Sequence, residues 1–236
     1  MVCGKTNVGL RRKENEDNFY CWEQGDRYIL VASDGMGGHK AGSIASFLVV
    51  SAIKDYAEKY DMFENTEKKI KNAISYANEI VYLQSCSHKD RAGMGATVVM
   101  AVGKGKKVYI GNLGDSRAYC ISPEKITRIT EDHSYVFELV KNGIITEEEA
   151  RYHPQKNEIM KAVGIGNEVF PDVFSLSLKS SEKLLLCTDG LTNMVEDKKI
   201  CEIVNSKKSD EEILTELIDE ANNNGGTDNI TAVLKS

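Results

Sequence analysis

Aspartates that end apolar runs and precede glycine are the residues of this 236-residue chain best suited to chemistry. Asp34 ends the run 28–34 and is followed by Gly35, and Asp189 ends the run 183–189 and is followed by Gly190. A buried strand can deliver one carboxylate to its end, and glycine then permits a sharp turn. Further carboxylates occupy comparable places: Asp228 just before the last apolar run, Asp115 between two strand-like runs, and Glu16 and Asp17 near the start.

Carboxylates at neighbouring strand ends would suit hard divalent cations. They repel one another and lose hydration when buried, and a cation bound between them offsets both costs. Mg²⁺ and Mn²⁺ prefer oxygen ligands and retain several waters. Two such ions about 3.5–4 Å apart can activate a bridging water and clamp the oxygens of a phosphoryl group. Gly35 has no side chain, so its backbone carbonyl can approach an ion as a further ligand.

Each of these pieces also has a plainer interpretation. An Asp-Gly pair after a strand is most often only a turn. Asp115 could pair with Arg117 at the start of a strand, and residues 15–17 could form a solvated loop. Five such pieces in one chain, at least three of them joined to apolar runs, favour a common site over separate turns.

The order of the predicted elements favours an α+β fold. Residues 95–102 and 107–111 predict a hairpin, and residues 229–234 predict a C-terminal strand. Two predicted helices follow the first strand, and many strands then come in succession. That grouping favours sheets packed on each other with helices outside, over strict alternation of strand and helix.

Helix signals and one polar segment complete the pattern. Apolar residues at helical spacing predict helices over 45–56 and 70–81, with Asn65 as N-cap of the second. Thr146 and Ser209 open capping boxes of further helices. The polar segment 131–167 lies between strand-like regions and predicts a flap that shapes substrate access.

Composition excludes several classes of protein. A net charge of −6 argues against nucleic acid as a main partner, because binding to a polyanion depends on clustered Lys and Arg. No run approaches the roughly 20 apolar residues that span a bilayer, and the start lacks the layout of a secretion signal.

Six cysteines without C-x-x-C spacing are typical of reduced thiols, so we expect a cytoplasmic protein without a zinc site. No linker divides the chain, so we expect a single domain over 1–236, and a monomer.

Several motifs, in this order, resemble those of the protein phosphatase 2C family, the metal-dependent PPM class, in its compact bacterial form. They are Arg12-x-x-Asn-Glu-Asp17, Asp34-Gly-Met-Gly-Gly-His39, Gly93-Met-Gly-Ala-Thr97, Gly111-Asn-Leu-Gly-Asp-Ser-Arg117, Thr188-Asp-Gly190 and Gly225-Gly-Thr-Asp-Asn229. The resemblance covers nearly the whole chain. It implies a central antiparallel β-sandwich flanked by helices. It also implies hydrolysis of phosphoserine and phosphothreonine in proteins by a water that bridges two metal ions, opposing a Hanks-type Ser/Thr kinase.

The resemblance also implies roles for single residues. Asp34 would bridge two Mn²⁺ or Mg²⁺ ions with help from the Gly35 carbonyl, and Asp189 and Asp228 would complete the shell of one ion. Asp17, or Glu16 beside it, would support the second ion. Asp115 with Asp189 matches a third-ion site, and Arg12 matches the arginine that holds the substrate phosphate. Met36 stands where animal members carry His, and His39 comes later, so the general acid is not assigned.

Two other interpretations remain beside the metal-dependent enzyme. Cys21 and Arg27 have the C-x₅-R spacing of cysteine phosphatases, but the residues between them are acidic and indicate a hairpin turn. The chain could also be a degenerate phosphatase fold that only binds phosphoproteins. Such a protein should have lost one of Asp34, Asp189 and Asp228, and all three are present.

Overall fold

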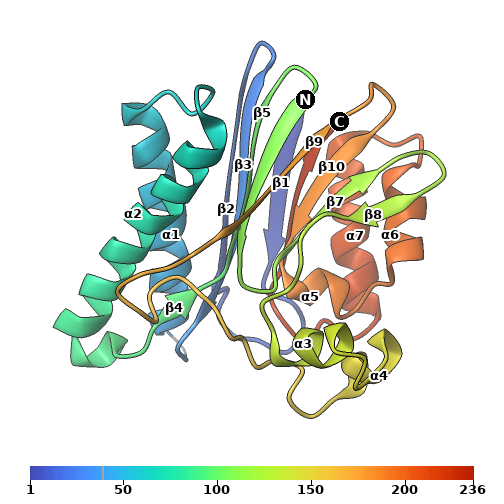
Figure 1. The fold of residues 1–236 in the computed structure, drawn as a ribbon. Helices are drawn as coiled ribbons and strands as arrows, with labels where there is room; N and C mark the ends of the chain where they lie inside the picture. The colour runs from blue at the N-terminus through green and yellow to red at the C-terminus, as the bar shows by residue number, and fades with distance from the viewer. Residues whose placement is uncertain (39) are drawn as a thin grey trace.

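Two antiparallel sheets packed face to face form the centre of the computed structural model, which describes residues 1–38 and 40–236 (Figure 1). One sheet has the strand order β1-β11-β10-β7-β8, and the other has the order β2-β3-β5-β6-β9, with β4 paired to β3. The strands are β1 (Val2–Asn7), β2 (Asp17–Gln24), β3 (Arg27–Met36), β4 (Gly95–Ala96), β5 (Val98–Lys104), β6 (Lys107–Leu113), β7 (Arg117–Ile121), β8 (Ile126–Arg128), β9 (Asp172–Ser177), β10 (Lys183–Cys187) and β11 (Ile230–Lys235).

Helices cover the outer face of each sheet. Helices α1 and α2 pack on the sheet that contains β3, whereas α6 and α7 pack on the sheet that contains β11 (Figure 1). The helices are α1 (Lys40–Lys59), α2 (Thr66–Ser87), α3 (Tyr135–Lys141), α4 (Glu147–Tyr152), α5 (Asp189–Thr192), α6 (Asp197–Val204) and α7 (Asp210–Asn223), with a 3₁₀ turn over Lys89–Arg91. The expected helix–sheet–sheet–helix layering is confirmed.

The core of three layers explains why the strands have continuous apolar runs. Side chains of a strand alternate between its two faces. In β3, Ile29 and Val31 pack against the α1–α2 layer, and Tyr28, Leu30 and Ala32 pack between the sheets. Because both faces are buried, every position favours an apolar residue.

Most predicted elements are confirmed, and three details are wrong. Asp34 does not end its strand, because β3 continues to Met36. The hairpins and the C-terminal strand form, and Cys21 and Arg27 lie on the β2–β3 hairpin, with Gln24 opposite Arg27. Asp189 does not end a strand: β10 stops at Cys187, and Asp189 is the first residue of α5. Asn65 precedes α2 as expected, but it has a left-handed backbone with φ of 50° and its side chain makes no capping hydrogen bond.

The two capping boxes form as their sequences predict. Thr146 and Ser209 accept hydrogen bonds from the backbone N–H groups of Glu149 and Glu212, whose side chains bond back to the cap residues. The first box opens α4 and the second opens α7.

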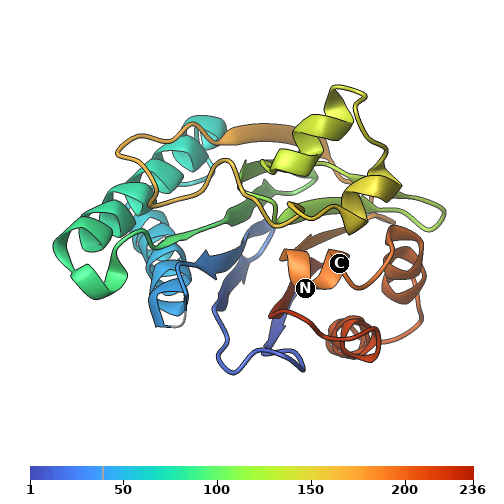
Figure 2. The same ribbon diagram turned by 90° about the horizontal axis from the view of Figure 1, so that it is seen from below.

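The predicted flap is a mostly irregular segment between β8 and β9 that contains α3 and α4. It lies at the lower end of the sandwich in Figure 1, and the view from below shows it running across that end (Figure 2). Backbone bridges between Ala96 and Val163, and between Ser134 and Ile159, fasten the returning part of the flap. In the part of the chain that the structure describes, no helix combines the length and apolar character needed to span a bilayer.

Candidate metal centre

The antiparallel topology brings the predicted carboxylates to one edge of the sandwich. Asp17 begins β2 and lies directly opposite Asp34 of β3 in the register. Asp189 follows β10, and Asp228 precedes β11, its antiparallel neighbour, so the end of one strand meets the start of the other. Asp115 precedes β7, which pairs with the other side of β10. Residues that are far apart in the chain therefore meet where the flap crosses.

Nearly all the predicted site residues line a cavity of about 520 Å³ at this edge. Its lining includes Arg12, Glu16, Asp34, Gly35, Asp115, Asp189 and Asp228. Asp17 is behind the wall, with 4% of its surface exposed, and its Oδ2 accepts a hydrogen bond from the Thr188 hydroxyl at 2.8 Å. His39 lies outside the described residues.

Three buried carboxylate oxygens at this edge indicate a place for cations. The Oδ1 atoms of Asp17, Asp115 and Asp189 have no hydrogen-bond partner in the described part of the chain. Leaving a buried polar atom unpaired is costly, and more so for a charged group. Carboxylate oxygen is the ligand that Mg²⁺ and Mn²⁺ prefer, so this donor set fits such ions.

The electrostatics of the edge support the same conclusion. Burial raises the pKa of Asp17 to about 7, and the charges of Asp189 and Asp228 add to the effect, against hydrogen bonds from Thr188 and Thr231. Burial and then the neighbouring aspartates also hold the pKa of Asp34, Asp115 and Asp189 above the ordinary value. A bound cation would favour the charged forms of all these groups.

The carboxylates surround the cavity without closing on one point. Over residues 1–38 and 40–236, no three His, Cys, Asp or Glu side chains form a ready ligand cluster. Mg²⁺ usually keeps several waters and is held by one or two carboxylates, so a site for it need not be a tight cluster of three side chains.

Arg12 lies at the rim of the cavity in contact with one predicted ligand. Its Nη2 donates to Oδ2 of Asp228 at 2.8 Å, and its side chain is 48% exposed. The backbone N–H groups of Leu10 and Arg11 bond to the Gly226 carbonyl, which holds this loop against the segment before β11. About half of the Arg12 side chain therefore remains accessible to a phosphate that enters the cavity.

Gly35 has a packing reason to be glycine besides the one inferred from the sequence. A Cβ at this position would lie 2.0 Å from the Gly42 carbonyl oxygen and 2.7 Å from that of Glu16. The close approach of β3 to the first turn of α1 thus requires glycine. Its backbone N–H also donates to the Glu16 carbonyl at 3.1 Å.

The ion pair between Asp115 and Arg117 that the sequence allowed does not form. Arg117 instead donates to both carboxylate oxygens of Asp132, at 2.6 to 3.0 Å, and to the Tyr119 hydroxyl at 3.3 Å. Asp132 lies 15 residues from Arg117 in the chain, so a local pattern could not reveal this partner.

Buried polar residues that the sequence analysis missed hold the carboxylates in place. Asn229 accepts from the Glu16 N–H and donates to the carbonyls of Val8 and Glu14, and so fixes the loop that carries Arg12. Thr97 accepts from the Asp34 N–H at 2.9 Å and shares a hydrogen bond with Ser116. All of them lie inside the motifs noted for their glycines and aspartates, which was the available signal.

Comparison with known proteins identifies the family of this chain. The family model described as Protein phosphatase 2C matches residues 10–235. The chain is 39% identical over 234 residues to the "Serine/threonine phosphatase stp" of Listeria monocytogenes serotype 4b, covering 98% of this chain and 93% of the relative. The chain therefore belongs to the protein phosphatase 2C family.

Two solved structures show the same fold. Serine/threonine phosphatase Stp1 from Staphylococcus aureus superimposes with a TM-score of 0.94 at 38% identity, covering 99% of this chain and 93% of that one. The catalytic domain of the serine threonine protein phosphatase PstP, solved in complex with two manganese ions, gives a TM-score of 0.88 at 33% identity. That match covers 99% of this chain and 96% of the solved catalytic-domain chain.

The raised pKa of Asp17 predicts an unusual pH dependence for the metal-free protein. A carboxyl group with a raised pKa binds its proton more tightly when folded. Its contribution to stability is therefore present below the unfolded pKa near 4 and is lost as pH rises through about 7. In excess EDTA, the parent should lose stability between pH 5 and pH 8 as Asp17 ionises, whereas Asp17→Asn lacks this loss. The free energy of unfolding of the variant minus that of the parent should therefore be larger at pH 8 than at pH 5. Chemical denaturation at both pH values measures this, and a difference that does not change with pH would contradict it.

Proposed function

We propose that this protein is a metal-dependent protein serine/threonine phosphatase, with residues 1–236 forming one phosphatase domain. The class of enzyme follows from membership of the protein phosphatase 2C family. The observation that carries the proposal is the set of buried carboxylate oxygens without a hydrogen-bond partner: Oδ1 of Asp115 and of Asp189, which line the cavity that Arg12 borders, and Oδ1 of Asp17 behind its wall. The two manganese ions of the PstP complex favour Mn²⁺, while the oxygen ligands here also suit Mg²⁺.

Different residues of the cavity would bind the ions and the substrate phosphate. Asp34, which is close enough to the other four aspartates for their charges to raise its pKa, would hold two ions, with the Gly35 carbonyl, Asp189, Asp228 and Asp17 or Glu16 as further ligands. Asp115 and Asp189 would hold a third, weaker ion. When bound, the ions supply an activated water and neutralise charge on the phosphoryl oxygens. Arg12 would hold two phosphate oxygens, because its planar fork matches their geometry.

The non-catalytic alternative has no observation in its favour. The three aspartates whose loss would mark a degenerate member all line the same cavity. We also propose, from the family resemblance, that the substrates include a Hanks-type kinase. An autophosphorylated kinase domain of that type should lose phosphate, and one that stays phosphorylated while a phosphopeptide is hydrolysed would contradict this.

The purified protein should release phosphate from a phosphothreonine peptide only when a divalent cation is present. EDTA should abolish the activity, and excess Mn²⁺ should restore it. Asp34→Asn removes the charge that would bridge the ions, so we expect nearly complete loss of kcat with the fold retained, checked by circular dichroism. Full activity of this variant at saturating Mn²⁺ would sink the proposal.

Arg12→Ala should lower kcat/KM about 30- to 150-fold, the equivalent of roughly 2–3 kcal/mol for a charge-assisted hydrogen bond. Arg12→Lys should recover only part of this, since a point charge cannot hold two oxygens in a fixed plane. Arg11 also lines the cavity, so Arg11→Ala is the matched control and should have a small effect. If Arg11→Ala is the more damaging change, the phosphate-binding role belongs to Arg11.

A further inference from the structure

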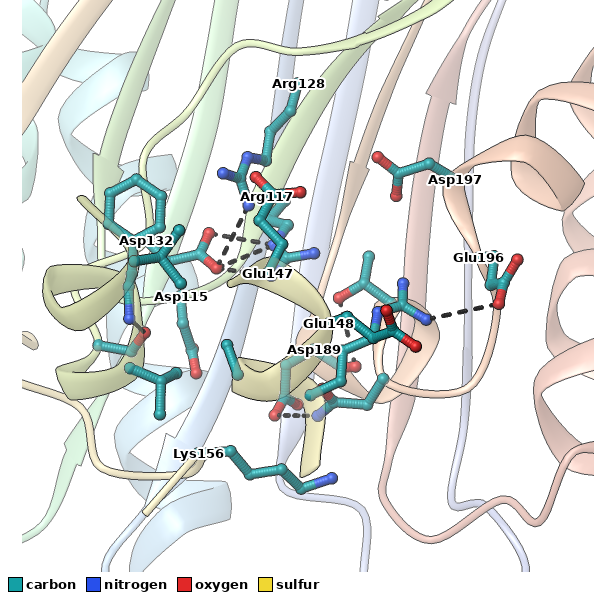
Figure 3. Close-up of a pocket in the computed structure, with 18 of the residues that line it drawn as sticks. Asp115, Arg117, Arg128, Asp132, Glu147, Glu148, Lys156, Asp189, Glu196 and Asp197 are labelled. Atoms are coloured by element: carbon teal, nitrogen blue, oxygen red, sulfur yellow. Dashed lines mark hydrogen bonds and ion pairs between the residues drawn. The ribbon is translucent and has the colours of Figure 1, made fainter. Parts of the chain in front are cut away.

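A second cavity, of about 790 Å³, lies beside the first, between the flap and helices α5 and α6. Asp115 and Asp189 line both cavities, and Arg117 and Asp132 line the second one (Figure 3). Arg117 is two residues from Asp115 in the chain, and its register partner Cys187 is two residues from Asp189. A guanidinium in this position is a natural competitor for the two carboxylates that the proposed function assigns to cations.

In the structure, the Arg117 guanidinium is already hydrogen-bonded to other partners. Nε of Arg117 donates to both oxygens of Asp132 at 3.0 Å, and Nη2 donates to Oδ2 at 2.6 Å. Nη1 donates to the hydroxyl of Tyr119, which donates in turn to Asp197 of α6 at 3.2 Å. Each edge of the guanidinium thus has a partner, and only 6% of the Asp132 side chain is exposed.

Asp132 also faces a second cation. Arg128 lies 3.7 Å from its Oδ2, and the Arg128 guanidinium is placed over the Phe137 ring at 5.1 Å from the centroid. Asp132 therefore lies between two arginines, while Oδ1 of Asp115 and of Asp189 remain buried without a partner among the described residues. The Arg117 guanidinium and these two carboxylate oxygens therefore line the same cavity without a hydrogen bond between them.

We propose that Asp132 is a positioning residue that holds Arg117 away from Asp115 and Asp189, so that these carboxylates stay available to divalent cations. The inference rests on the proposed function. An arginine paired with a buried carboxylate must be displaced before a cation can bind there, so the pairing would lower the affinity for the cation. Asp132 prevents that competition by offering Arg117 a bidentate partner, the geometry that arginine prefers.

The test is a calorimetric titration of Mn²⁺ into the EDTA-stripped protein. Asp132→Asn keeps the size of the side chain but loses the charge that holds the guanidinium. We expect its Mn²⁺ affinity to fall at least about tenfold, the scale of a buried charge interaction. The second-site change Arg117→Gln removes the released competitor, so the double variant should bind Mn²⁺ within a few-fold of the parent. A crystal structure of metal-free Asp132→Asn should show Arg117 bonded to Asp115 or Asp189.

The matched control is Glu131→Gln. It removes the same charge one residue away, from an exposed pair with Lys141, and should leave Mn²⁺ affinity within about twofold. Asp132→Asn that binds Mn²⁺ like the parent but melts at a lower temperature would show that the pair only braces the flap, and would overturn the inference. If Asp132→Asn does not fold, Arg117→Gln alone decides: it should bind Mn²⁺ at least as tightly as the parent, and weaker binding would overturn the inference. A parent protein that binds no Mn²⁺ would instead remove the proposed function as well.

Discussion

Repulsion among carboxylates at one edge of the sandwich is the constraint on which the rest of the structure depends. Gathering and burying aspartates destabilises the fold unless protons or cations compensate, and the raised pKa of Asp17, Asp34, Asp115 and Asp189 expresses that cost. The two packed sheets and their helices bury enough apolar surface to hold the edge together. The proposed metal binding and the stability of the metal-free fold therefore place opposite demands on these residues.

Uncharged polar residues hold these groups in place without adding to the repulsion. Thr188 supports Asp17, Thr97 with Ser116 supports the backbone of Asp34, and Asn229 fixes the loop of Arg12. These residues are buried and hydrogen-bonded, so each can fix a position at little electrostatic cost. Arg117 carries a charge beside the same carboxylates, and Asp132 binds it from the flap side.

The sequence predicted most of the fold, because continuous apolar runs and helical spacing report directly on burial. It could not give the strand order, since β1 pairs with β11 across the length of the chain and no local pattern records that contact. The candidate carboxylates were predicted from strand ends and glycines, with the resemblance assigning their roles. The sequence offered Asp115 only as a possible partner for Arg117 and could not reveal Asp132, which is its neighbour in space but not in the chain. Asn229 and Thr188 were missed as supports because a buried hydrogen bond leaves no periodic signal.

Anomalous scattering at the manganese edge, from crystals grown with Mn²⁺, tests the central claim most directly. The account predicts two strong peaks in the cavity, both within ligand distance of Asp34, with Asp189 and Asp228 at one of them. A third, weaker peak is expected between Asp115 and Asp189. Peaks that avoid Asp34, or a cavity without manganese in crystals of active protein, would contradict the account.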